Sequence, residues 1–281
     1  MKARVGSTVI LCVLVAWVLW SAGILGGVFL LALCSALTQW ELYQLMEKMG
    51  WKPQKKMATA WGIIVVQGSF FSREGIFDFS YVLSALVLAT VIFAFFVVLA
   101  GEPEDLKNIF LPTIFGILYV PTLFCIPLLF ARNLLILSDP NLPLLLILWI
   151  IFVAKLSDIG GLLVGRRFGK RKLAPAFSPQ KTYEGLMGSL LFSVTGGYIF
   201  VFCCGCAWPA NFTGIKIGAI AAIIAVIALI SDLVESGFKR LAGVKDSGRM
   251  IPGIGGAFDL MDSLILSLPA GVIIIKTFIF R

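Results

Sequence analysis

Carboxylate, hydroxyl and ammonium groups recur at helical spacing in one apolar stretch of the chain. Four side chains there would share one helix face: Asp232, Glu235, Ser236 and Lys239. Carboxylate and hydroxyl oxygens are hard ligands of the kind that Mg²⁺ prefers. The spacing therefore predicts a divalent-cation site. The alternative, a helix end that emerges into water, suits Lys239 better than it suits Asp232, which lies deeper in the apolar stretch.

A glycine-rich segment follows this stretch. Three glycines and a proline fall within 252–256, which favours a tight, non-helical loop whose backbone N–H groups can approach an anion. A plain connection between two helices is the alternative. Beyond the loop, Asp259 and Asp262 are three residues apart and would share a face. Because Asp232 and Asp259 flank the loop on antiparallel helices, one cation could bridge them.

A basic loop precedes both features. Six lysines and arginines fall between residues 166 and 181, among prolines, glycines and the run Ser-Pro-Gln-Lys-Thr at 178–182. Such a rigid loop, rich in hydrogen-bond donors, can hold a triphosphate. By charge alone, the loop could instead set membrane topology or contact anionic lipid.

Ionisable residues also interrupt an apolar run at Lys155 and Asp158, which are three apart. A charge inside a membrane helix costs about 2.5–3.5 kcal/mol, so this pair predicts either a polar face that lines a site or an internal ion pair. The chain contains no histidine. Any catalysis must therefore rest on carboxylates, lysine, arginine and a metal ion rather than on an imidazole base.

The elements that carry these residues are membrane helices. Of 281 residues, 59% are hydrophobic and only 14% charged, with a mean hydropathy of +1.00. This excess of hydrophobic over charged residues excludes a cytosolic globular enzyme, a disordered chain and a disulfide scaffold. We expect an all-α polytopic membrane protein with about nine transmembrane helices. Residues 7–46 should form two of them, with a tight turn near Ser21–Gly27. The others are expected at 57–70, the shortest, and at 81–100, 108–131, 142–164, 184–207, 215–238 and 260–279.

Charge places the polar loops on one side of the membrane. With the N-terminus inside, the segments assigned to the cytoplasm hold most of the 23 lysines and arginines. The acidic segment 101–107 is the exception. Residues 1–150 are expected to form N-terminal transmembrane helices, and 151–281 a catalytic region with cytoplasmic loops. Few exposed loops and no targeting extension favour a bacterial inner membrane. The net charge of +8 suits phosphates or anionic lipid head groups.

These residues resemble a known family, the phosphatidate cytidylyltransferases. The family signature reads S-x-φ-K-R-x₄-K-D-x-G-x₂-φ-P-G-H-G-G-φ-x-D-R-φ-D. The chain supplies Ser236, Lys239, Arg240, Lys245, Asp246, Gly248, Pro252, Gly253, Gly255, Gly256, Asp259 and Asp262 at the matching positions. An upstream family stretch is matched by Asp158, Gly160, Gly165 to Pro175 and Ser178 to Gly185. Ile254 and Leu260 depart from the family's usual histidine and arginine.

The resemblance implies the transfer of a cytidylyl group from CTP to phosphatidic acid, giving CDP-diacylglycerol and pyrophosphate in phospholipid synthesis. It implies Mg²⁺ bound by Asp232 and Asp259, with Asp262, Asp246 and Glu235 as further ligand candidates. The triphosphate would be neutralised by Lys239, Arg240 and Lys245, and contacted by Ser178, Lys181, Thr182 and Ser236. Arg166 and Arg167 would meet the lipid phosphate. The acyl chains would stay in the lipid bilayer, nucleic acid is not an expected partner, and a homodimer is left open.

Three alternatives remain at this point. A CTP-dependent lipid or polyprenol kinase would release CDP rather than pyrophosphate. A transporter would use the buried charges as an ion path, although they gather at helix ends and no inverted repeat is visible. A degenerate, low-activity family member is suggested by Ile254 and Leu260.

Overall fold

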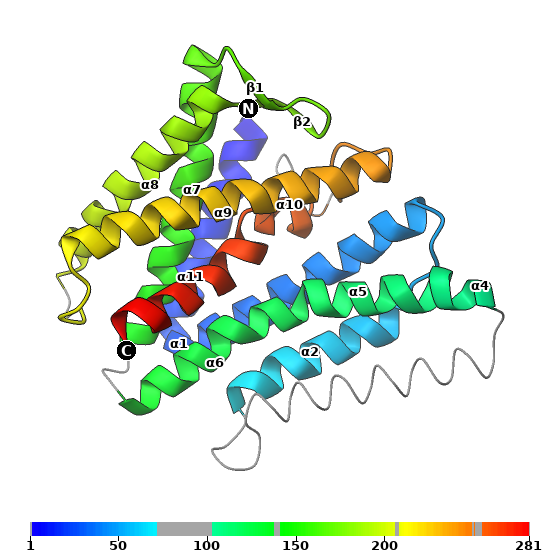
Figure 1. Ribbon diagram of the computed structural model, residues 1–281. Helices are drawn as coiled ribbons and strands as arrows, with labels where there is room; N and C mark the ends of the chain where they lie inside the picture. Colours follow the sequence, from blue (N-terminus) through cyan, green and yellow to red (C-terminus); the bar gives the residue numbers. More distant parts are fainter. Residues whose placement is uncertain are drawn as a thin grey trace. The chain divides into compact units, whose positions relative to one another are not determined.

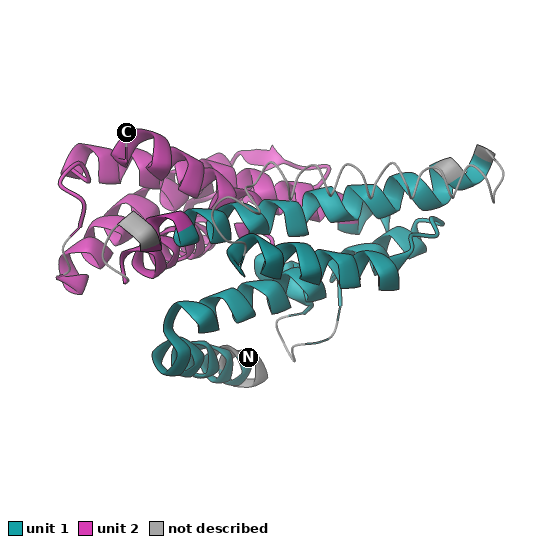
Figure 2. Cartoon of the chain, turned by 90° about the horizontal axis from the view of Figure 1, so that it is seen from below, with its two compact units in different colours: residues 1–132, 239–261 teal, residues 133–238, 262–281 magenta. Residues whose placement is uncertain are grey.

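The computed structural model describes residues 2–71, 103–137, 141–205, 208–248, 250 and 255–280. The chain divides into two compact units, one of residues 1–132 and 239–261, the other of residues 133–238 and 262–281 (Figure 2). The described part is almost entirely α-helical, as expected, apart from one short β-hairpin. The chain passes from one unit to the other after residues 132, 238 and 261, and each unit is described in turn.

The first unit is built around α1 (Lys2–Lys48), which consists of two helical halves that meet at a sharp break (Figure 1). Its elements are α1, α2 (Lys55–Phe71), α4 (Pro103–Asp105), the π-helical turn η1 (Leu106–Phe110), α5 (Leu111–Tyr119), most of α6 (Pro121–Leu137) and α10 (Ala257–Met261). Helix α1 leaves helical geometry at Gly23, where φ is 53° and ψ is −131°. A left-handed φ favours glycine. The turn predicted near Ser21–Gly27 therefore agrees with a break at this residue.

Buried polar side chains join α1 to its neighbours. The Tyr43 hydroxyl donates to the carbonyl oxygen of Thr113 at 2.7 Å, and the Thr113 hydroxyl accepts from the backbone N–H of Gln54 at 2.9 Å. A side chain at Gly116 would overlap the Tyr43 ring, so this glycine lets α5 approach α1. These bonds satisfy polar groups that would be costly to leave unpaired in an apolar interior.

The second unit consists of α7 (Leu142–Phe168), strands β1 (Lys172–Ala174) and β2 (Ser178–Thr182), α8 (Tyr183–Cys204), α9 (Gly214–Leu241, as far as Phe238) and α11 (Leu264–Ile279). Helices α7 and α8 pack closely through small residues. A side chain at Gly188 would overlap Val164, and the Ser189 hydroxyl donates to the carbonyl oxygen of Ser157 at 2.8 Å. Small residues and such bonds are how helices associate in lipid, where no hydrophobic force drives them together.

The basic loop is a hairpin, which the sequence did not predict. Strands β1 and β2 are antiparallel, with Lys172 opposite Thr182. The Thr182 hydroxyl accepts from the backbone N–H of Gly185 at 3.1 Å and so caps the N-terminus of α8. The Glu184 carboxylate accepts from the backbone N–H groups of Lys170, at 3.0 Å, and Arg171. The loop therefore has a defined shape.

Six helical segments of the described residues are long and apolar enough to cross a membrane, which indicates an integral membrane protein. They are Val9–Lys48, Lys107–Leu135, Leu142–Phe168, Tyr183–Cys204, Gly214–Leu241 and Ala257–Ile279. The predicted count of about nine is not confirmed. The run at 57–70 does form a helix, α2, but at 17 residues it is not among the six. The run at 81–100 lies outside the described residues. No disulfide joins cysteines in the described part of the chain.

Candidate active site

Three carboxylates meet in the second unit. One oxygen from each of Asp232, Glu235 and Asp262 lies within 4.8 Å of the others. Asp232 and Glu235 are three residues apart on α9, so they leave the helix on the same face. Asp262 directly precedes α11. Glu235 is fully buried and the other two are half-buried. Oxygen ligands at this spacing fit a hard divalent cation such as Mg²⁺.

Hydrogen bonds to Ser231 hold Asp262 beside α9. The Ser231 hydroxyl donates to the backbone carbonyl oxygen of Asp262 and accepts from the backbone N–H of Leu266 at 3.3 Å. The Asp262 carboxylate in turn accepts from the backbone N–H of Ser263 at 2.6 Å. The start of α11 is thus fixed against α9, and this contact brings a residue distant in sequence to the pair on α9.

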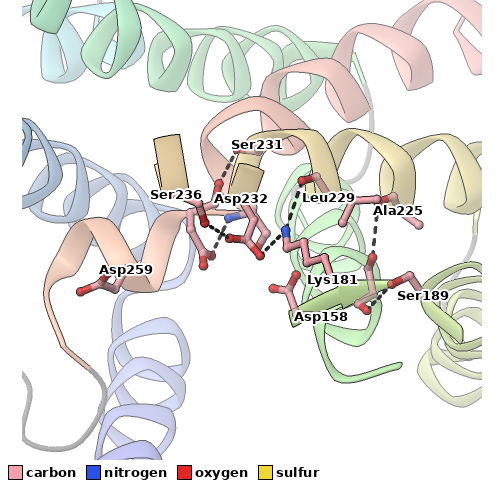
Figure 3. Close-up of polar contacts among 12 residues, drawn as sticks. Asp158, Lys181, Ser189, Ala225, Leu229, Ser231, Asp232, Ser236 and Asp259 are labelled. Atoms are coloured by element: carbon pink, nitrogen blue, oxygen red, sulfur yellow. Dashed lines mark hydrogen bonds and ion pairs between the residues drawn. The ribbon is translucent and has the colours of Figure 1, made fainter. Parts of the chain in front are cut away.

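Lys181 reaches Asp232 from the hairpin (Figure 3). Its Nζ lies 2.6 Å from Asp232 Oδ2 and 3.4 Å from the carbonyl oxygen of Leu229. The Ser236 hydroxyl donates to Asp232 Oδ1 at 3.4 Å. Asp232 is therefore placed between a hydroxyl on its own helix and an ammonium from β2, so the basic loop and the acidic helix form one site.

Lys155, a residue of α7, pairs with Asp158 of the same helix and with Asp262. Its Nζ lies 3.4 Å from Asp262 Oδ1, 3.6 Å from Asp158 Oδ2 and 2.9 Å from the Ser263 hydroxyl. The internal ion pair and the polar face that the sequence suggested are thus the same feature. Two lysines thus lie beside a group of four carboxylates: Asp158, Asp232, Glu235 and Asp262.

The signature residues of the first unit form a second polar cluster. Asp259 Oδ1 lies 2.9 Å from Lys239 Nζ. Asp259 Oδ2 accepts from the backbone N–H of Gly256 at 2.8 Å and from both the N–H and the hydroxyl of Ser247 at 3.0 Å. Gly255, with φ of 121°, allows the turn that brings these donors to the carboxylate. Asp259 therefore anchors the loop that precedes α10.

Residues 2–278 match the cytidylyltransferase family. The chain belongs to this family. Similar proteins are named phosphatidate cytidylyltransferase: one of Haemophilus influenzae is 41% identical over 133 residues, 47% of this chain and 46% of the relative. Those of Staphylococcus haemolyticus and Staphylococcus aureus are 41% and 39% identical over 123 residues, 44% of this chain and 46% of each relative. The matched stretch spans about half the length of these relatives.

The family resemblance noted in the sequence is thus confirmed, and the structure says where its residues lie. The second unit brings together Asp232, Glu235, Asp262, Ser236 and Lys181. Glu235 and Asp262, ranked second from sequence, are the partners of Asp232 there. Asp259 and Lys239 are paired in the other unit. A cation shared by Asp232 and Asp259 therefore stays a prediction.

The remaining candidates lie in strand β2, in the last turns of α7 and α9, and in the segment after α9. Ser178 begins β2, and Thr182 is buried as a helix cap, a role that the sequence analysis did not foresee. The side chains of Arg166, Arg167, Arg240, Lys245 and Asp246 are exposed, which suits contacts with a charged ligand. The departure at Leu260 lies in α10. Pro252, Gly253 and Ile254 lie outside the described residues.

One carboxylate of the polar clusters was missed altogether. Glu41 of α1 accepts a hydrogen bond from the Ser247 hydroxyl at 2.7 Å. The only signal in the sequence was a lone acidic residue, followed by Leu42, near the end of a long apolar run. Its partner lies about 200 residues further along the chain, and no local pattern predicts such a pairing.

Proposed function

We propose that this member of the cytidylyltransferase family is a phosphatidate cytidylyltransferase. The reaction would convert CTP and phosphatidic acid to CDP-diacylglycerol and pyrophosphate. The observation that carries the proposal is the carboxylate cluster of Asp232, Glu235 and Asp262, paired with lysines from two neighbouring elements in a chain of this family. The names of the relatives and the membrane-spanning helices support the same substrates.

The chemistry of this reaction suits a site without histidine. The nucleophile is a phosphate monoester whose second pKa is about 6, so it is largely ionised at neutral pH and needs no protein base. The barrier comes from bringing two anions together and from the charge that develops on the departing pyrophosphate. Fixed cations beside the phosphates are the main requirement.

The residues present fit Mg²⁺. Asp232, Glu235 and Asp262 would hold the ion, because one oxygen of each lies within 4.8 Å of the others. Mg²⁺ at this position would neutralise charge on the phosphates of CTP. Asp259, which the family resemblance assigns to Mg²⁺ together with Asp232, and Asp246 remain candidates as well. A magnesium requirement of the activity, with Ca²⁺ as a poor substitute, is the expected behaviour.

The basic residues would bind the two anionic substrates. Lys181 would turn from Asp232 to the triphosphate, beside Ser178 and Ser236, and Thr182 would hold the hairpin in place. Lys239, Arg240 and Lys245 are proposed to neutralise triphosphate or pyrophosphate, and Arg166 and Arg167 the lipid phosphate. In this proposal the site faces the cytoplasm of a bacterial inner membrane, and the acyl chains stay in the bilayer.

The test is a reaction with purified protein in detergent, radiolabelled CTP, phosphatidic acid and Mg²⁺. We expect labelled CDP-diacylglycerol and an equal amount of pyrophosphate. Asp232→Asn should lower the rate at least 100-fold, whereas Glu104→Gln, which neutralises an exposed carboxylate of the first unit, should not change it. Release of CDP with a phosphorylated lipid would establish a kinase instead, and no product from folded protein would refute the proposal.

A further inference from the structure

Glu41 is a buried carboxylate in a membrane-spanning helix. The residue is 4% exposed, and it lies in the Val9–Lys48 segment. A charge in that environment is expensive unless donors satisfy it. Two donors converge on Glu41 Oε2: the Ser247 hydroxyl at 2.7 Å and the backbone N–H of Phe258 at 2.9 Å. Both belong to the signature segment, one before its glycine-rich loop and one in the first turn of α10.

Ser247 links Glu41 to Asp259. Its hydroxyl oxygen lies 2.7 Å from Glu41 Oε2 and 3.0 Å from Asp259 Oδ2. A hydroxyl has one proton, so it can donate to only one carboxylate at a time. The Ser247 backbone N–H, at 3.0 Å from Asp259 Oδ2, supplies the second donor. Glu41, Ser247, Asp259 and Lys239 therefore form one connected chain of polar contacts within the first unit.

Two signature glycines make room for this carboxylate. A side chain at Gly248 would overlap Glu41 Oε1, and one at Gly256 would overlap Glu41 Oε2. Neither residue has a positive φ, so conformational freedom is not what requires glycine at these positions. The close approach of Glu41 is a sufficient reason for both. The signature segment is thus shaped around a residue of α1 that lies outside the signature itself.

We propose that Glu41 is a positioning residue for the signature segment. By accepting hydrogen bonds from Ser247 and Phe258, it links Ser247 to the first turn of α10 and orients Asp259 and Lys239. The expected effect of Glu41 on the reaction rate rests on the proposed cytidylyl transfer. The expected effect on hydrogen exchange at residues 256–259 does not depend on any activity. Glu41 itself touches no substrate in this proposal.

Three variants separate positioning from general stability. Glu41→Ala removes the hydrogen-bond acceptor. Glu41→Asp keeps a carboxylate on a side chain that is one methylene shorter. Glu41→Gln keeps a carbonyl oxygen that can accept both hydrogen bonds. We expect kcat to fall at least tenfold in the Ala and Asp variants, with KM for phosphatidic acid changed less than threefold. The Gln variant should keep at least a third of the wild-type kcat. Tyr43→Phe, two residues along α1, loses its bond to Thr113 and should lower Tm with kcat unchanged.

Hydrogen exchange measured by mass spectrometry gives a readout without substrate. The amides of 256–259 should exchange at least tenfold faster in Glu41→Asp than in wild type, and at the wild-type rate in Tyr43→Phe. A Glu41→Asp kcat within twofold of wild type, unchanged exchange, or a Gln variant as slow as the Ala variant would overturn the proposal. If wild-type protein makes no CDP-diacylglycerol but exchange changes as expected, the proposed function fails and the positioning role stands.

Discussion

Replacing Lys181 by methionine should tighten metal binding while slowing the reaction. Lys181 Nζ lies 2.6 Å from Asp232 Oδ2, and the two side chains are only 17% and 24% exposed. A divalent cation that binds Asp232 must compete with this ammonium for the same carboxylate. Methionine has a similar length and no charge, so Lys181→Met removes the competitor and leaves the apolar part of the side chain in place.

The size of the effect follows from Coulomb's law. At a separation of roughly 5 Å, a single and a double positive charge repel by about 7 kcal/mol at an effective dielectric constant of 20, and by about 1.7 kcal/mol in water. Lys181 can turn toward solvent when the cation arrives, so the lower figure applies. We therefore expect a gain of about 1.5 kcal/mol, or roughly tenfold tighter binding.

Titration of the detergent-purified protein with Mn²⁺, followed by electron paramagnetic resonance, measures this affinity directly. Lys170→Met is the matched control, because Lys170 is an exposed lysine of the same loop. It should shift the Kd less than twofold, and Asp232→Asn should weaken binding at least tenfold. In turnover assays, kcat/KM for CTP should fall in Lys181→Met because its proposed phosphate contact is lost. A Kd for Mn²⁺ in Lys181→Met that equals or exceeds the wild-type value would refute the competition.

The other expected outcomes concern the cluster and the packing around it. Asp262→Asn should raise the Mg²⁺ concentration for half-maximal activity at least tenfold, and equal magnesium curves for variant and wild type would contradict the ligand assignment. Gly188→Leu should lower Tm, since overpacking costs about 1–3 kcal/mol and the added side chain would overlap Val164. Gly248→Ala should lower Tm more in wild type than in Glu41→Ala, and an equal shift in both backgrounds would show that the glycine does not accommodate Glu41.

The sequence predicted the membrane helices of the second unit closely. The runs at 142–164, 184–207 and 215–238 correspond to Leu142–Phe168, Tyr183–Cys204 and Gly214–Leu241. Hydropathy determines these spans because each crosses an apolar medium and must satisfy its backbone internally. The hairpin at 172–182 was missed because its strands are short and partly exposed, so neither leaves an alternating pattern.

From the sequence, only those contacts of the site could be predicted that join residues of one helix. Asp232 and Glu235 are close because they are three residues apart on one helix. Their pairing with Lys181 and Asp262 depends on how the hairpin and the start of α11 pack against α9, and no local pattern contains that information. Glu41 is the extreme case, since its donors come from the far end of the chain. Helical spacing thus predicted which side chains could bind a cation or a phosphate, and the packing of the elements determines which of these side chains lie close together.

The ion pairs of the second unit connect stability to function. Carboxylates at the end of a membrane helix are costly unless cations accompany them, because each unpaired charge loses its hydration without compensation. Lys155 and Lys181 provide that compensation from α7 and β2. Lys155 contacts Asp158, Asp262 and Ser263 together, whereas Lys181 comes from a hairpin and pairs with Asp232. In the proposed function, Lys155 would therefore stay in place when a divalent cation binds, and Lys181 would turn its ammonium group from Asp232 to an incoming phosphate.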